Sequence, residues 1–281
     1  MTEEIFRCLL GGFNIKDAFE VVDLLFDNGY TSVSCYEKSS HWMVEILNTQ
    51  LIQESEIYAV IGNYNFPKIK IEKLQKTDWL KKSFTNLKSI IVGDFYIYGP
   101  HLRHEPIPTD KIAIEIAAAT AFGSGEHPTT KRCLLACQTF FDEKKHKAVL
   151  DIGCGSCILS IALAKLGARC IDAYDNDTEA VRISIENIAI NKVAHQINVF
   201  QNQRCEFSKK KYDFIVANIL TDPLISMGKA IASSISRDGI LVLSGFTSDD
   251  DNVLQKYRSL GLKLKFKYDY KGWGTLVFMK N

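Results

Sequence analysis

A glycine-rich turn is the segment of this sequence best suited to approach a small ligand. The apolar strand predicted over Ala148–Asp151 ends in an acid, and Gly153 and Gly155 follow before a helix begins. Glycine lets the backbone come close to a ligand where a Cβ atom would clash. Ile158 stands where a dinucleotide fingerprint has Gly or Ala, and an acid before the turn disfavours a pyrophosphate. A ligand with a cationic amine fits this turn better.

S-adenosylmethionine carries such an amine, and two further strand ends offer groups that suit it. Asp175 follows a predicted strand and can accept hydrogen bonds from both ribose hydroxyls. Helix capping is the alternative for Asp175, although Asp177 is the better placed N-cap. Asn218 ends the buried strand Phe214–Ala217, where its carbonyl oxygen can accept a hydrogen bond from an amine. An ordinary strand-to-helix turn would also explain Asn218.

The segment 122–130, Phe-Gly-Ser-Gly-Glu-His-Pro-Thr-Thr, has the most unusual composition in the chain. Pro128 suits the first turn of a helix predicted over Thr129–Phe141. Hydroxyl groups and free backbone N–H groups at a helix start can bind a carboxylate, such as that of the methionine part of S-adenosylmethionine. His127 is either a general base or a structural residue of the loop. A tight turn with an ordinary cap is the alternative for the whole segment.

Alternating strands and helices predict a mostly parallel sheet, covered on both faces, over residues 111–281. One of its helices is predicted over Pro223–Ile235. Residues 1–75 have the order βαββαβ, which suggests a ferredoxin-like α+β domain. Residues 76–110 form a linker region and candidate hinge, with one strand over Ile90–Tyr98.

Composition and charge exclude several classes of protein. Apolar residues make up 46% and charged residues 24%, which excludes global disorder. No apolar run is long enough to span a membrane, and the acidic start is unlike a secretory signal, so a cytoplasmic protein with reduced thiols is expected. Residues 1–63 hold ten acids and three bases, a net charge of −7, against +8 for the remainder. This acidic segment either attracts a basic partner or is a solvated face.

Cys154 and Cys157 have the spacing of a redox pair or half a zinc site. The sequence has no second pair with ligand spacing, since Cys133 and Cys137 lie four apart on a predicted helix, so small core residues are the favoured interpretation and no metal is expected.

Three motifs together resemble the class I S-adenosylmethionine-dependent methyltransferases and, more closely, the PrmA family. They are the segments 122–130, 151–159 (Asp-Ile-Gly-Cys-Gly-Ser-Cys-Ile-Leu) and 218–220 (Asn-Ile-Leu), and the Leu-Ser-Gly-Phe at 243–246 adds to the likeness. The resemblance implies a Rossmann-like sheet with an antiparallel last strand and an N-terminal domain that recognises the substrate. Two departures are Ser124 in place of Thr, which keeps the hydroxyl, and Cys157 in place of Gly. The small side chain of Cys157 either fits beside the cofactor or lowers the affinity for it, and the sequence leaves both outcomes open.

By this resemblance the cofactor is S-adenosylmethionine, and the enzyme methylates lysine and α-amino groups of a basic protein of the large ribosomal subunit. Asn218 would be the catalytic residue. We expect a monomer that does not bind nucleic acid directly. The residues implied to contact the cofactor are Phe122, Thr130, Gly153, Gly155, Asp175 and Asn218.

Three other functions stay open at this point. An N-methyltransferase for nucleic acid would prefer Asn-Pro-Pro-aromatic where this chain has Asn218-Ile219-Leu220. An NAD-linked oxidoreductase would need the third glycine of the fingerprint. A non-catalytic module that only binds the cofactor is the third, and Cys157 is its best support.

Overall fold

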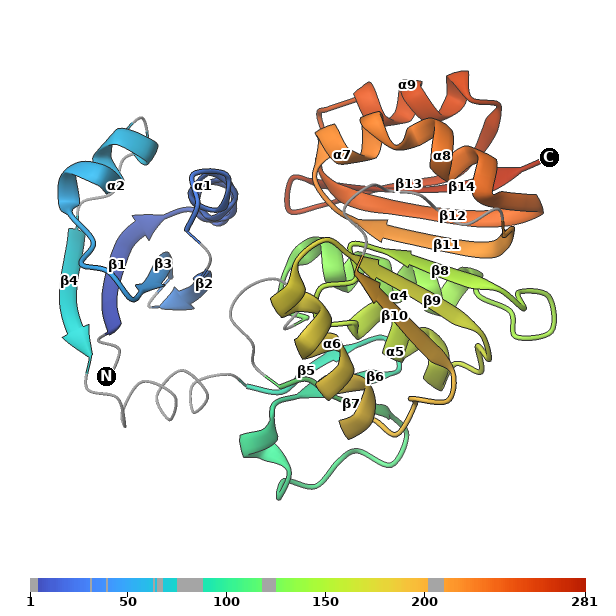
Figure 1. The fold of residues 1–281 in the computed structure, drawn as a ribbon, viewed down its shortest axis with the longest axis horizontal. Coiled ribbons are helices and arrows are strands. Elements are labelled where there is room, and N and C mark those ends of the chain that lie inside the picture. The colour runs from blue at the N-terminus through green and yellow to red at the C-terminus, as the bar shows by residue number, and fades with distance from the viewer. Residues whose placement is uncertain are drawn as a thin grey trace. The chain divides into compact units, whose positions relative to one another are not determined.

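The structure is a computed structural model that describes residues 5–30, 32–38, 40–62, 64, 68–74, 88–117, 125–201 and 210–281. The chain divides into two compact units, the first within residues 1–87 and the second from residue 88 onward (Figure 1). No helix in the described parts of the chain has the length and apolar character needed to span a membrane.

The N-terminal unit is a four-stranded antiparallel sheet with two helices. Its strand order is β2-β3-β1-β4. Apolar side chains of both helices pack on one face of the sheet, where Leu10, Val22, Leu25, Ile46 and Ile57 are buried. The element order follows the βαββαβ order expected from the sequence. The elements are β1 (Ile5–Phe13), α1 (Ile15–Asp27), β2 (Val33–Lys38), β3 (His41–Asn48), α2 (Glu54–Ile61) and β4 (Lys68–Leu74).

The second unit is built on a seven-stranded sheet of order β10-β9-β8-β11-β12-β14-β13. The five strands from β10 to β12 are parallel, and β14 is antiparallel to both of its neighbours. This confirms the predicted α/β class with a mostly parallel sheet and an antiparallel last strand. The strands are β8 (Val149–Ile152), β9 (Ile171–Asp175), β10 (Ile197–Gln201), β11 (Tyr212–Asn218), β12 (Ile235–Thr247), β13 (Leu262–Tyr270) and β14 (Trp273–Lys280).

Helices cover both faces of this sheet (Figure 1). Side chains of α4 and α5 form one core with the strands, and side chains of α7, α8 and α9 form a second core on the opposite face. The helices are α4 (Pro128–Phe140), α5 (Ile158–Lys165), α6 (Thr178–Ile190), α7 (Thr221–Ser226), α8 (Gly228–Ser234) and α9 (Asn252–Ser259).

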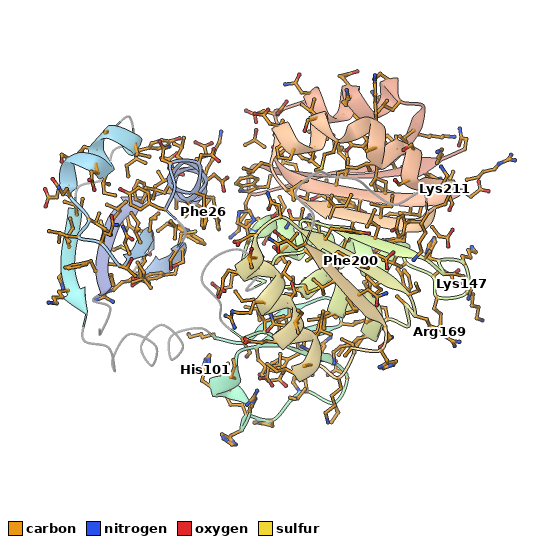
Figure 2. All side chains as sticks on the ribbon, viewed as in Figure 1. Phe26, His101, Lys147, Arg169, Phe200 and Lys211 are labelled. Atoms are coloured by element: carbon orange, nitrogen blue, oxygen red, sulfur yellow. The ribbon has the colours of Figure 1, made fainter. Side chains whose placement is uncertain are left out.

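The chain order of the strands reverses between β8 and β11. From β8 the chain runs to β9 and β10 on one side, and it then returns to β11 on the other side of β8. In open parallel sheets, ligands bind beyond the carboxyl ends of the strands at such a reversal. Lys147, Arg169 and Lys211 lie one or two residues before β8, β9 and β11, and Figure 2 shows them together on one side of this unit. They mark the amino ends of the strands, opposite the expected ligand edge.

The segment predicted as a linker belongs largely to the second unit. Residues from 88 form a three-stranded sheet, and Val92, Phe95 and Ile97 join the same core as α4 and α5. The single strand expected over Ile90–Tyr98 is a hairpin that turns at Gly93, whose φ of +58° suits glycine. Residues 88–110 therefore pack as part of the second unit, and the hinge expected within 76–110 stays a prediction. The elements are β5 (Ile90–Val92), β6 (Phe95–Tyr98), the 3-10 helix η1 (Pro100–Leu102) and β7 (Ile112–Glu115).

Two further predictions are corrected near the C-terminus. The single helix predicted over Pro223–Ile235 is two helices that meet at Met227. At Gly228, a Cβ atom would lie 3.1 Å from the Lys256 side chain, so α8 and α9 pack closely at that point. Helix α9 itself was not predicted, because its eight residues are short for a periodic signal.

Candidate active site

The glycine turn between β8 and α5 lies at the reversal point of the sheet. Gly153 and Gly155 have φ values of +70° and +53°, in the left-handed region that glycine adopts without strain. A Cβ atom at Gly153 would overlap the Cγ2 atom of Ile219, the residue after Asn218. The turn and the end of β11 are therefore packed together at one edge, as the strand ends in the sequence predicted.

Asp175 holds the glycine turn from the neighbouring strand. Its Oδ2 atom accepts a hydrogen bond from the backbone N–H of Gly155 at 2.8 Å, and its Oδ1 atom accepts one from the N–H of Asp177 at 3.0 Å. Asp177, in turn, is the N-cap of α6, since its carboxylate accepts from the N–H of Glu179 at 2.9 Å. The predicted cap is confirmed, and Asp175 does not fill that role. A carboxylate has about four acceptor sites, so Asp175 retains capacity for hydroxyl groups.

Asn218 and Thr130 meet although 88 residues separate them. The Nδ2 atom of Asn218 donates to the hydroxyl oxygen of Thr130 at 3.3 Å. The Oδ1 atom of Asn218 is buried and has no hydrogen-bond partner among the described residues. Buried polar atoms are normally satisfied. The carboxamide is thus held by its nitrogen, and its oxygen is not engaged by any of the residues that the structure describes.

His127 is the N-cap of α4 rather than a residue poised for proton transfer. Its Nδ1 atom accepts from the backbone N–H of Thr129 at 3.1 Å and lies 2.6 Å from the Thr129 hydroxyl. Burial, with a smaller contribution from the charge of Lys131, lowers the pKa of His127 from 6.5 to about 3. The ring also packs edge-on against Trp273, with centroids 4.9 Å apart. Of the two roles that the sequence left open for His127, the structure supports the structural one.

Asp151 is buried beneath the glycine turn, with 1% of its surface exposed. One carboxylate oxygen accepts from the Ser160 hydroxyl at 2.6 Å, and the other has no hydrogen-bond partner in the described part of the chain. Burial raises the pKa of Asp151 from 3.8 to about 7, and the hydrogen bond from Ser160 opposes this shift. A cation near Asp151 would favour its charged form. The sequence predicted the acid but not Ser160, which lies nine residues later on α5.

Cys154 and Cys157 are buried free thiols. The hydrogen bond that the Cys154 thiol donates to Cys157, together with burial, raises the pKa of the Cys154 thiol. Such thiols are unreactive. Cys133 and Cys137 are also fully buried on α4, as expected for small core residues. In the regions that the structure describes, no three His, Cys, Asp or Glu side chains gather as metal ligands.

Gly245 lies beside the chain that follows Asn218, and only the structure explains why a glycine is needed there. It forms a bulge in β12 with a φ of +101°, and a Cβ atom there would overlap the backbone of Ile219. Gly245 thus allows the chain after Asn218 to pass close to β12. Phe122 lies outside the described residues, so its predicted contact with the cofactor stays a prediction.

The sheet reversal, the glycine turn and the polar strand ends agree with the class I S-adenosylmethionine-dependent methyltransferases that the sequence motifs resemble. The residues present fit that cofactor. Asp151 offers an unpaired buried oxygen to a cationic centre, Asp175 offers acceptors to ribose hydroxyls, and the glycines admit close backbone approach. When bound, S-adenosylmethionine supplies a methyl group on a sulfonium that leaves readily.

Comparison with known proteins gives the family. The family model described as ribosomal protein L11 methyltransferase (PrmA) matches residues 17–281, and the chain belongs to this family. It is 31% identical over 249 residues to the ribosomal protein L11 methyltransferase of Caulobacter sp. (strain K31), covering 87% of this chain and 85% of the relative. It is 37% identical over 207 residues to that of Brucella abortus (strain S19), covering 72% of each chain.

A solved structure agrees with the sequence relatives. The ribosomal protein L11 methylase of Lactobacillus delbrueckii subsp. bulgaricus superposes with a TM-score of 0.64 at 27% identity. The match covers 69% of this chain and 100% of that one.

Proposed function

We propose that this chain transfers methyl groups from S-adenosylmethionine to lysine side chains and the α-amino group of ribosomal protein L11. The names of the relatives support the substrate, and the edge of the sheet around Asn218 supports the chemistry. The cofactor contacts in this proposal are Thr130, Gly153, Gly155, Asp175 and Asn218, together with Phe122.

The observation that carries the proposal is the unpaired oxygen of Asn218. Thr130 fixes the carboxamide through its nitrogen, and the buried Oδ1 atom has no donor among the described residues, which supports a role in accepting from the substrate amine. An amine that donates one N–H to this oxygen has its direction of approach set, which aims its lone pair along the line of attack. Correct alignment of two reacting groups is one of the largest contributions a protein can make to a rate.

The substrate amine must be neutral to attack. A lysine amine has an ordinary pKa near ~10.4, and removal from water lowers it because the charged form loses hydration. His127 is buried, caps α4 and has a pKa of about 3, which makes it a poor base for this step. We therefore assign loss of the proton to desolvation and solvent rather than to a dedicated base.

The N-terminal domain, proposed as residues 1–75, is assigned to recognition of a basic protein. Glu20, Asp23 and Asp27 lie on α1, and burial together with the charges of Asp27 and Glu20 raises the pKa of Asp23 to about 7. A cationic partner would relieve that repulsion. In this proposal the enzyme is a cytoplasmic monomer that binds its protein substrate and not nucleic acid.

The experiment that tests the proposal is transfer of labelled methyl groups. Purified ribosomal protein L11 and ribosomal RNA are each offered with labelled S-adenosylmethionine, and mass spectrometry locates the methyl groups on the product. We expect label on amines of L11, and Asn218→Ala should lower kcat by about a hundredfold, since alignment is lost. Asn198→Ala is the matched control, because Asn198 is an exposed residue on the edge strand β10.

Each of the other outcomes identifies a different function. Label in RNA alone would assign the enzyme to nucleic acid. Cofactor binding without transfer to either substrate would leave a non-catalytic module. Equal activity of Asn218→Ala and Asn198→Ala would remove Asn218 from the mechanism.

A further inference from the structure

Helix α6 carries a row of polar side chains on the side that faces the core. Ser184, Asn187 and Asn191 follow each other by three and four residues, and their exposed fractions are 0%, 0% and 9%. A helix face that packs against a core is normally apolar. Buried amide and hydroxyl groups are retained only where hydrogen bonds compensate their lost hydration. The partners of this row therefore show what it does.

The first partners are carbonyl groups of the glycine turn. Ser184 donates its hydroxyl to the carbonyl oxygen of Gly155 at 2.7 Å, and Asn187 donates from Nδ2 to the carbonyl oxygen of Ser156 at 2.9 Å. Asp175, at the end of β9, accepts a hydrogen bond from the N–H of Gly155. The turn is thus fixed by donors from α6 and an acceptor from β9.

The second partners belong to the chain that leads out of β7. The N–H of Ala117 donates to Oδ1 of Asn187 at 2.9 Å. Asn191 pairs with the backbone of Glu115 in both directions, accepting from its N–H at 3.1 Å and donating to its carbonyl oxygen at 2.6 Å. These contacts place α6 against the end of β7, the strand that precedes the segment 122–130.

We propose that Asn187 is a positioning residue that sets the spacing between the glycine turn and the chain after β7, and thereby sets the affinity for the methyl donor. A single planar carboxamide bonds to Ser156 with its nitrogen and to Ala117 with its oxygen. The two backbone segments, 39 residues apart, therefore cannot move independently. This inference rests on the proposed function, since it concerns the same cofactor site.

The test compares Asn187→Leu with Gln196→Leu. Leucine resembles both residues in size and removes both hydrogen bonds in each case. Gln196 donates to the carbonyl oxygens of Ala164 and Ala168 at 3.0 and 2.7 Å, at the far end of α5 from the turn. Each variant therefore loses two side-chain hydrogen bonds to the backbone, and only Asn187→Leu should disturb the cofactor site. Ser184→Ala is a milder second variant that loses the bond to Gly155 and the contact of the same hydroxyl with the Cys154 thiol, both within the glycine turn.

Two measurements are made on each protein. Calorimetry gives Kd for S-adenosylmethionine, and hydrogen exchange of the ligand-free protein reports the amides of residues 115–117 and 153–157. We expect Asn187→Leu to raise Kd by about tenfold or more, because unpaired buried groups force the turn to relax. Exchange should rise in both segments together. Gln196→Leu should leave Kd within about twofold and raise exchange only near residues 164–168.

The outcomes separate this inference from the proposed function. If the parent protein does not bind S-adenosylmethionine, the proposed function fails. If the parent binds and Asn187→Leu binds equally well, or if Gln196→Leu weakens binding as much, the positioning role is wrong. If Asn187→Leu does not fold, Ser184→Ala decides: faster exchange at 153–157 with weaker binding supports the role, and unchanged exchange and Kd refute it.

Discussion

Cys157→Gly tests whether the side chain at this departure from the family motif hinders the cofactor. The sequence alone left open whether a side chain here fits beside the cofactor or weakens its binding. In the structure Cys157 has φ +65° and ψ +18°, a left-handed conformation at the N-cap of α5. Its side chain is fully buried within the core shared by α4 and α5. A side chain with no accessible surface has nothing to present to a ligand at the edge of the sheet.

Two opposing effects on stability follow from this geometry. The left-handed conformation costs a residue with a Cβ atom about 1 kcal/mol relative to glycine. Removal of the buried Cβ and Sγ atoms costs about 1 to 1.5 kcal/mol in lost burial. The free energy of unfolding of Cys157→Gly should therefore stay within about 1 kcal/mol of the parent. The affinity for S-adenosylmethionine should change by less than about twofold.

The assay combines urea unfolding with a calorimetric titration of S-adenosylmethionine. Cys137→Ala is the matched control, because Cys137 is also fully buried in the same core but lies within the regular helix α4. In Cys137→Ala, the free energy lost with the buried Sγ atom is not offset by any relief of backbone strain. A tightening of binding by tenfold or more in Cys157→Gly would refute the reasoning, since the side chain would then be shown to obstruct the cofactor.

Three further predictions follow from the site. Gly245→Ala should lower the free energy of unfolding by about 3 kcal/mol or more in urea titrations, since its Cβ atom would overlap the Ile219 backbone; a loss below about 1 kcal/mol would contradict this. His127 has its folded pKa depressed from 6.5 to about 3, so its stabilising effect is present above pH 6.5 and is lost as the pH falls toward 3. Between about pH 7.5 and pH 5.5 the parent should lose about 1.4 kcal/mol more than His127→Asn, which keeps a capping side chain, and equal losses would refute the shift. Asp175→Asn should raise Kd for both S-adenosylmethionine and S-adenosylhomocysteine by about tenfold in calorimetry, because one acceptor becomes a donor, and an unchanged Kd would remove Asp175 from the site.

Local chemistry made much of the second unit predictable from the sequence. Gly153 and Gly155 mark a turn with positive φ, and Asp177 marks the start of α6, because these signals depend only on near neighbours in the chain. The grouping of Asp175 and Asn218 at one edge also followed from the sequence. Parallel strands end at the same edge of a sheet, so polar residues that follow them must gather there.

Only the tertiary structure decided which of these residues touch and what each one does. The bond from Asn218 to Thr130 spans 88 residues and depends on how the sheet is ordered, which no local pattern encodes. Burial decided that His127 caps a helix and that the Cys157 side chain turns into the core. The tertiary structure also decided the role of Asn187, which in the sequence is only one of several polar residues of a helix. Its function depends on the backbone groups that folding brings to it, because a buried amide must take its hydrogen-bond partners from distant parts of the chain.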